Sequence, residues 1–187
     1  MRRAVIDVGT NSVKLLVADV SGREIHPVCE ESKQTRLGQG FYETHRLLPE
    51  AITNTAQAVA AFAEQAHTHQ AGELRIIATS AARDAVNAGE LVAAIERSCG
   101  KKLEIISGEQ EADWAFQGVT TDPALAQVPL LLLDVGGGSP RALGRRLRRS
   151  LGGSLRCRLG RSLRCRLRRG LGRRILGQLL QRCDGAG

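Results

Sequence analysis

The chain has 187 residues and a formal net charge of +8, but the excess of positive over negative charge lies entirely in its last 47 residues. Residues 1–140 carry 12 Lys and Arg against 18 acidic residues, whereas residues 141–187 carry 15 Arg, no Lys and one acid. The overall charge is therefore no evidence for a nucleic-acid-binding domain, and the absence of any apolar run near the ~20 residues of a membrane helix predicts a cytoplasmic chain.

Strand and helix patterns alternate over the first 140 residues in the order of an α/β domain. A long helix is expected to open at Pro49, which suits a first helical turn, and another to end at Gly100, a good helix-terminating residue. The expected strands cover 4–8, 13–20, part of 24–37, 74–78, 102–106 and 130–135, and the expected helices cover 49–70, 88–99 and 108–119.

Two stretches far apart in the chain share one pattern. Residues 4–12 and 131–139 each form an apolar run that ends in Asp and turns through glycine into a hydroxyl residue. Such a turn suits backbone amides that close on a phosphate, while the Asp carboxylate holds a metal. The pair predicts a phosphate clamp made of two loops that face each other.

The order of five short motifs resembles the Ppx/GppA family of exopolyphosphatases and guanosine pentaphosphate phosphohydrolases. The motifs occupy 7–12, 36–40, 78–85, 105–112 and 134–139, so the resemblance covers residues 1–139. It implies an RNase H-like lobe of the actin, sugar-kinase and heat-shock-ATPase superfold. The expected domains are that lobe (1–125), the first strand and phosphate loop of an incomplete second lobe (126–139), and an irregular Arg/Leu/Gly-rich tail (140–187).

The resemblance also implies roles for individual residues. Glu111 is expected to be the general base that activates a water, and Asp7 and Asp134 are expected to hold Mg²⁺. The residues expected to bind substrate phosphate are Gly9, Thr10, Asn11, Ser12, Arg83, Gly136, Gly137, Gly138 and Ser139. Simpler interpretations remain open: Glu111 as a first-turn acid of its helix, the Asp residues as turn formers, and Arg83 as a salt-bridge partner of Asp84.

The implied function is a cytoplasmic, Mg²⁺-dependent phosphohydrolase that releases terminal orthophosphate from polyphosphate or guanosine pentaphosphate. One alternative is an ATP-dependent kinase or ATPase of the same superfold, which shares the two phosphate loops but does not need the 105–112 motif. The other is a non-specific polyanion binder that acts through the Arg-rich tail. No specific nucleic acid and no membrane is expected as a partner, and a homodimer stays open for a full-length form.

The tail from residue 140 follows a different pattern. Leucine recurs every four residues from Leu143 to Leu171, and because a helix turns about 100° per residue, this spacing builds no single apolar face. We interpret the tail as a shifted reading frame, with the resemblance ending at Ser139; the alternative is a genuine Arg-rich arm that binds RNA, DNA or polyphosphate. On this interpretation the 130–135 strand has no partner, and trypsin should remove the tail before the lobe.

Overall fold

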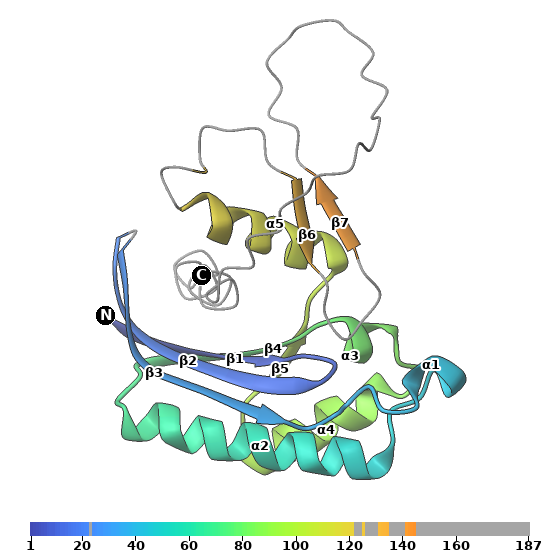
Figure 1. Ribbon diagram of the computed structural model, residues 1–187. Helices are drawn as coiled ribbons and strands as arrows, with labels where there is room; N and C mark the ends of the chain where they lie inside the picture. The colour runs from blue at the N-terminus through green and yellow to red at the C-terminus, as the bar shows by residue number, and fades with distance from the viewer. Residues whose placement is uncertain (23, 122–124, 126–130, 135–140, 145–187) are drawn as a thin grey trace, which may run out of the picture.

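The computed structural model describes residues 1–22, 24–121, 125, 131–134 and 141–144. Its main feature is a five-stranded sheet with the strand order β3-β2-β1-β4-β5 (Figure 1). The strands are β1 (Arg2–Val8), β2 (Ser12–Ser21), β3 (Glu24–Gln34), β4 (Glu73–Ala78) and β5 (Leu103–Ile105). The first three form an antiparallel meander, and β4 and β5 add to β1 in parallel.

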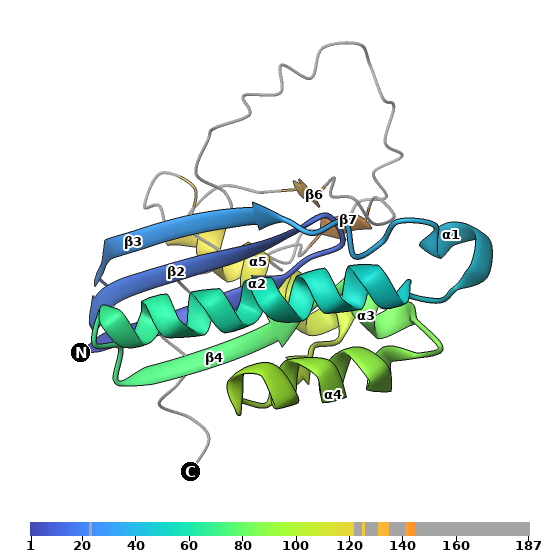
Figure 2. The ribbon, with the colours of Figure 1, turned by 90° about the horizontal axis from the view of Figure 1, so that it is seen from below.

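Two helices cover one face of this sheet and a third covers the other, as Figures 1 and 2 show. Helices α2 (Pro49–Thr68) and α4 (Ala88–Cys99) pack together on the first face, and α5 (Gly108–Thr120) lies on the second. Two short helices, α1 (Phe41–Thr44) and α3 (Ser80–Asp84), lie in the connections after β3 and β4. The lobe is therefore a three-layer α/β structure.

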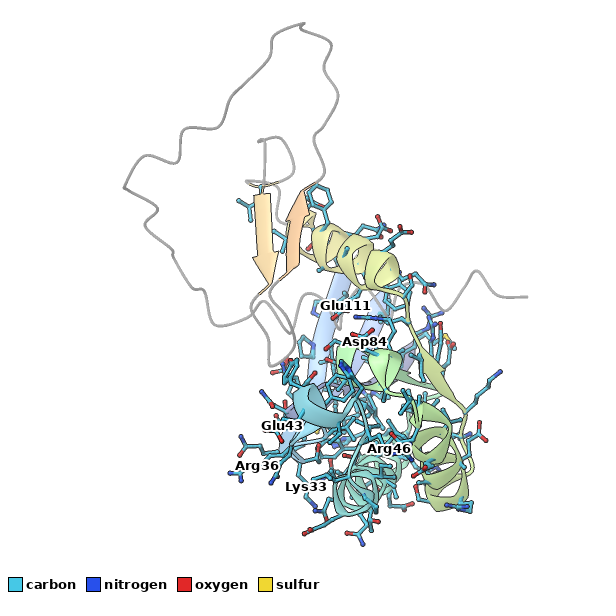
Figure 3. All side chains as sticks on the ribbon, turned by 90° about the vertical axis from the view of Figure 1, so that its right-hand side faces the viewer. Lys33, Arg36, Glu43, Arg46, Asp84 and Glu111 are labelled. Atoms are coloured by element: carbon cyan, nitrogen blue, oxygen red, sulfur yellow. The ribbon has the colours of Figure 1, made fainter. Side chains whose placement is uncertain are left out.

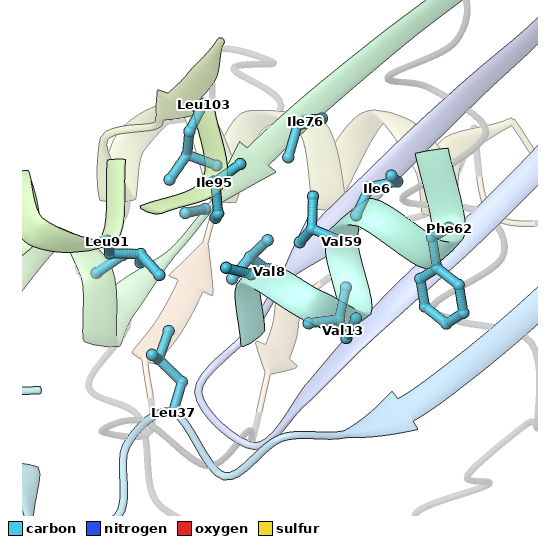
Figure 4. Packing of buried hydrophobic residues seen from close by; sticks show 14 of the residues in the cluster. Ile6, Val8, Val13, Leu37, Val59, Phe62, Ile76, Leu91, Ile95 and Leu103 are labelled. Carbon is cyan, nitrogen blue, oxygen red and sulfur yellow. The ribbon is translucent and has the colours of Figure 1, made fainter. Parts of the chain in front are cut away.

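The larger hydrophobic core lies between the sheet and the α2–α4 layer. Alternate residues of β1 and β2 point into it because successive side chains of a strand face opposite sides of the sheet. Figure 4 shows their packing against α2 and α4; the labelled core residues are Ile6, Val8, Val13, Leu37, Val59, Phe62, Ile76, Leu91, Ile95 and Leu103. The intervening residues form a smaller cluster on the other face, where Val5, Leu16 and Ile77 lie in one cluster with Trp114 of α5.

The predicted strands and helices of residues 1–121 are all present, with ends shifted by a few residues. The helix expected over 88–99 has those bounds, and the strand expected over 102–106 is shorter at Leu103–Ile105. Helices α1 and α3 were not predicted, since four or five residues are too few to show a helical period. Among the described residues, no helix is both long enough and apolar enough to cross a bilayer.

One expectation about the later chain is wrong. Strand β6 (Leu131–Asp134) is not left without a partner, because β7 (Arg141–Gly144) pairs with it antiparallel, Leu132 opposite Leu143. The first residues of the expected irregular tail thus form a strand. The physical reason is that a ladder needs only backbone N–H and C=O groups, which an Arg-rich sequence also supplies. Residues 145–187 lie outside the described residues.

Candidate active site

An ion pair joins the beginning of α5 to the end of α3. Helix α5 opens with a capping box, in which the Ser107 hydroxyl accepts from the Gln110 amide and the Gln110 side chain accepts from the Ser107 amide. This cap fixes the first turn, and Glu111 follows it. Arg83 of α3 donates from Nη1 to Glu111 Oε2 at 3.1 Å, with both side chains largely buried. Figure 3 shows Glu111 at this junction, next to Asp84.

Two of the three nitrogens of the Arg83 guanidinium have partners within the described part of the chain. Its Nη1 also donates to the carbonyl of Ile106 at 3.1 Å, and its Nε lies 3.5 Å from Asp84 Oδ1. Its Nη2 is buried and has no hydrogen-bond partner within the described part of the chain. A guanidinium fork is suited to bidentate contacts with phosphate oxygens. Arg83 thus holds Glu111, contacts Asp84 as the simpler interpretation expected, and leaves Nη2 unused among the described residues.

The first phosphate loop, Gly9 to Ser12, lies between β1 and β2 and is fixed from several sides. Gly9 N donates to Ser12 O at 3.0 Å, which closes the turn. The Thr10 hydroxyl is 2.9 Å from the Ser80 hydroxyl, at the first residue of α3. This contact connects the loop to the helix that carries Arg83. Loop, Arg83 and Glu111 therefore belong to one continuous cluster.

Gly38 supports the same loop from the segment after β3. Its amide donates to the Thr10 carbonyl at 2.8 Å, and a Cβ at position 38 would overlap Thr10 Cγ2. Only a residue without a side chain can approach Thr10 this closely. Ser80 and Gly38 were not among the predicted site residues. Ser80 lies inside the 78–85 motif and Gly38 inside the 36–40 motif, so the motifs were the sequence signal that could have identified them.

Asp7 lies on the same face of the sheet as α5. Asp7 lies two residues after Val5 in β1, so its side chain is on the same face of the sheet as Val5, which packs with Trp114. On the neighbouring strand β2, Lys14 lies opposite Asp7. Asp7 is half-buried at the end of β1 that leads into the phosphate loop. Asp7 is thus a carboxylate at the phosphate-loop end of β1, on the face of the sheet that α5 covers, and this position is compatible with the predicted metal-binding role.

The two residues expected to hold a metal, Asp7 and Asp134, are both carboxylates, the donor type that Mg²⁺ prefers. The described residues include no group of three His, Cys, Asp or Glu side chains that could hold a metal by themselves. Mg²⁺, however, is commonly held by one or two carboxylates together with substrate phosphates and water, which a pair of Asp residues would satisfy. Asp134 ends β6, but its side chain and the whole of Gly136, Gly137, Gly138 and Ser139 lie outside the described residues.

Comparisons with solved structures agree with this fold. The Aquifex aeolicus Ppx/GppA phosphatase, type II variant, superposes with a TM-score of 0.65 at 31% identity, over 76% of this chain and 47% of that one. An exopolyphosphatase from Cytophaga hutchinsonii superposes with a TM-score of 0.69 at 28% identity, over 79% and 48% of the two chains. The RNase H-like lobe of the actin-like superfold is thereby confirmed.

Comparisons of sequence identify the family. Exopolyphosphatase 2 of Mycobacterium tuberculosis is 42% identical over 147 residues, which is 74% of this chain and 46% of the relative. The chain thus spans about half the length of the relatives it matches. The Ppx/GppA phosphatase family model matches residues 16–143, which ends close to Ser139, where the predicted resemblance ends. The chain belongs to the Ppx/GppA phosphatase family.

Proposed function

We propose that this chain supplies the N-terminal half of the active site of a phosphohydrolase that releases terminal orthophosphate from polyphosphate. The observation that carries the proposal is the Arg83–Glu111 pair, in which a half-buried carboxylate is held beside a guanidinium with one unused donor, Nη2. A base next to a free phosphate-binding group is what hydrolysis of a phosphoanhydride requires. The mycobacterial sequence relative and the solved neighbour from Cytophaga hutchinsonii are both named exopolyphosphatases, which supports polyphosphate as the substrate.

Each side chain has a distinct part in the proposed reaction. Arg83 Nη2 binds an oxygen of the terminal phosphoryl group, and the amides and hydroxyls of Thr10, Asn11 and Ser12 bind the others. Glu111 accepts a proton from a water as that water attacks phosphorus in line with the leaving phosphate oxygen. Mg²⁺, held by Asp7 and Asp134, would supply positive charge against the phosphoryl oxygens.

Two finer assignments belong to the same proposal. Guanosine pentaphosphate is the second candidate substrate, because its terminal phosphoanhydride presents the same reacting group and the family is named for both activities. A kinase or ATPase of the superfold is disfavoured because the 105–112 motif is built into the site: Ile106 accepts from Arg83 and Glu111 pairs with it. Polyanion binding by the Arg-rich tail concerns residues outside the described part of the chain.

The test compares two acids of one helical turn. Orthophosphate release from polyphosphate, in the presence of Mg²⁺, is measured for this chain joined after residue 143 to the second half of the mycobacterial relative. We expect Glu111→Gln to abolish release and Glu109→Gln, an exposed acid of the same first turn, to leave it near the unmodified rate. Equal losses would mean that both acids only oppose the helix dipole, and the proposal would fail.

A further inference from the structure

A polar groove lies beside the first phosphate loop and is not part of the Arg83–Glu111 cluster. It has a volume of about 360 Å³. It lies between the first turns of α2 and the end of β3 with the segment that follows β3. Lys33, Thr35, Arg36 and Gln39 line one side, and Asn54 and Gln57 of α2 line the other. Figure 3 shows Lys33 and Arg36 on this side of the lobe, away from Glu111.

The groove has unused positive charge. Neither Lys33 nor Arg36 has an ion-pair partner among the residues that the structure describes, and both side chains are exposed to solvent at the groove. Glu50 is the single acid among the lining residues, so the lining carries a net charge of +1 from two cations and one carboxylate. The side-chain amides of the lining add neutral donors that can reach an anion's oxygens.

Two further groups of donors belong to residues that line the same groove. Helix α2, 20 residues long, begins at Pro49 without a side-chain cap at Leu48, and its first backbone bond is Ile52 N to Leu48 O. The amides of Glu50 and Ala51 therefore lie in the uncapped first turn, whose positive end favours anions. Thr35 is 7% exposed, and its buried Oγ1 has no hydrogen-bond partner within the described residues. An unpartnered hydroxyl in a lining residue is a donor that a ligand or its water can complete once the side chain rotates toward the groove.

We propose that this groove binds a second phosphate oxyanion, contacted by Arg36, Lys33 and the first turn of α2. The ligand chemistry is a tetrahedral phosphate, which is either free orthophosphate or one unit of a polyphosphate chain. The groove's volume accommodates a phosphate group with its water, and its combination of guanidinium, ammonium and helix N-terminus is the usual means of binding one.

The backbone connects this site to the first phosphate loop. The amides of Thr35 and Arg36 both donate to the carbonyl of Asn11, each at 3.0 Å. Arg36 has a φ of +51°, a conformation that a non-glycine residue adopts at some cost and that these two bonds hold in place. An anion bound by Arg36 therefore stabilises the segment that holds Asn11. This coupling rests on the proposed function, whereas binding in the groove does not.

The experiment titrates the full chain with orthophosphate and, separately, with tripolyphosphate at constant ionic strength. The amide NMR signals of Thr35, Arg36 and Gln39 report on the groove, and those of Arg83 and Glu111 report on the catalytic cluster. We expect saturable shifts in the groove signals. Saturation by orthophosphate identifies the free ion as the ligand, and saturation by tripolyphosphate alone identifies a unit of the chain.

Charge variants test which residues make the site. Lys33→Gln and Arg36→Asn should weaken binding about tenfold each, since each removes a charge-assisted hydrogen bond to the anion. Asn is chosen because it tolerates the positive φ. Glu50→Gln should tighten binding, because it removes the carboxylate beside the anion. Gln70→Asn, at another positive-φ position (φ 59°), and Lys101→Gln are the controls.

The proposal is overturned if the groove signals do not shift, or if they shift equally in the Lys33 and Arg36 variants and in the controls. Binding by the Arg-rich tail is common to all variants, so a difference between the groove variants and the controls does not come from the tail. Glu111→Gln should leave groove binding unchanged, so that loss of the proposed hydrolysis and loss of this site are separate results.

Discussion

Arg83 and Glu111, 28 positions apart in the chain, form an ion pair with a distance of 3.1 Å between Nη1 and Oε2. The same Nη1 donates to the carbonyl of Ile106, the residue after β5. One guanidinium thereby ties the end of a parallel strand to the first turn of the helix that follows it. The proposed base is held in position by this contact before any substrate binds, which lowers the cost of ordering it in the reaction.

The first prediction concerns Glu111→Ala in the joined protein described above. General-base catalysis contributes roughly 10²- to 10⁴-fold, so kcat for orthophosphate release should fall by about that factor. KM should change little, because the base acts in the transition state rather than in substrate binding. Steady-state release from polyphosphate and from guanosine pentaphosphate measures both constants. Unchanged kcat with both substrates would remove Glu111 from the mechanism.

The second prediction separates charge from geometry at Arg83. Arg83→Lys keeps the positive charge but has a single nitrogen, which cannot contact Glu111, Ile106 and a phosphate oxygen together. We expect KM for polyphosphate to rise by about tenfold, the effect of losing one charged hydrogen bond, and kcat to fall as well. A lysine variant with unmodified kinetics would show that only the charge at position 83 is used.

The third prediction concerns the close approach of Gly38 to Thr10. In Gly38→Ala the new methyl group would overlap Thr10 Cγ2, so the loop must shift and the Thr10–Ser80 contact is lost. Overpacking of this kind costs about 1–3 kcal/mol of stability. Gly89→Ala in α4 is the matched control, since nothing lies within 4 Å of its Cβ and alanine favours the helix. Urea unfolding measures both; equal midpoints for the two variants would contradict the clash.

The fourth prediction concerns a thiol on β3. Partial burial raises the pKa of Cys29, and the carboxylates of Glu31 and Glu30 raise it further. Because the thiolate is the reactive form, iodoacetamide should modify Cys29 slowly at pH 8 and faster as the pH rises further. Glu31→Gln removes a negative charge, lowers the pKa of the thiol and should speed the reaction at a fixed pH. The modified peptide is quantified by mass spectrometry, and Glu24→Gln, on the same strand, serves as the control.

Local patterns in the sequence accounted for the main elements of the lobe. Pro49 and the helical spacing after it predicted α2, Gly100 marked the end of α4, and the acids of the first turn marked the beginning of α5, because these signals arise from contacts between residues close in the chain. The order of motifs indicated the family. The short helices α1 and α3 and the strand β7 escaped prediction, since segments of four or five residues are too short to show a period.

The candidate residues could be named from their motifs, but their relations could not. Sequence alone determined that Glu111 begins a helix, that Arg83 follows a strand and that a glycine turn separates β1 from β2. Only the tertiary structure decided that Arg83 reaches Glu111, that Ser80 contacts Thr10 across 70 positions, and that the amides of Thr35 and Arg36 meet Asn11. The physical reason is that parallel strands β1, β4 and β5 end at one edge of the sheet, where their connections converge whatever their separation in the chain.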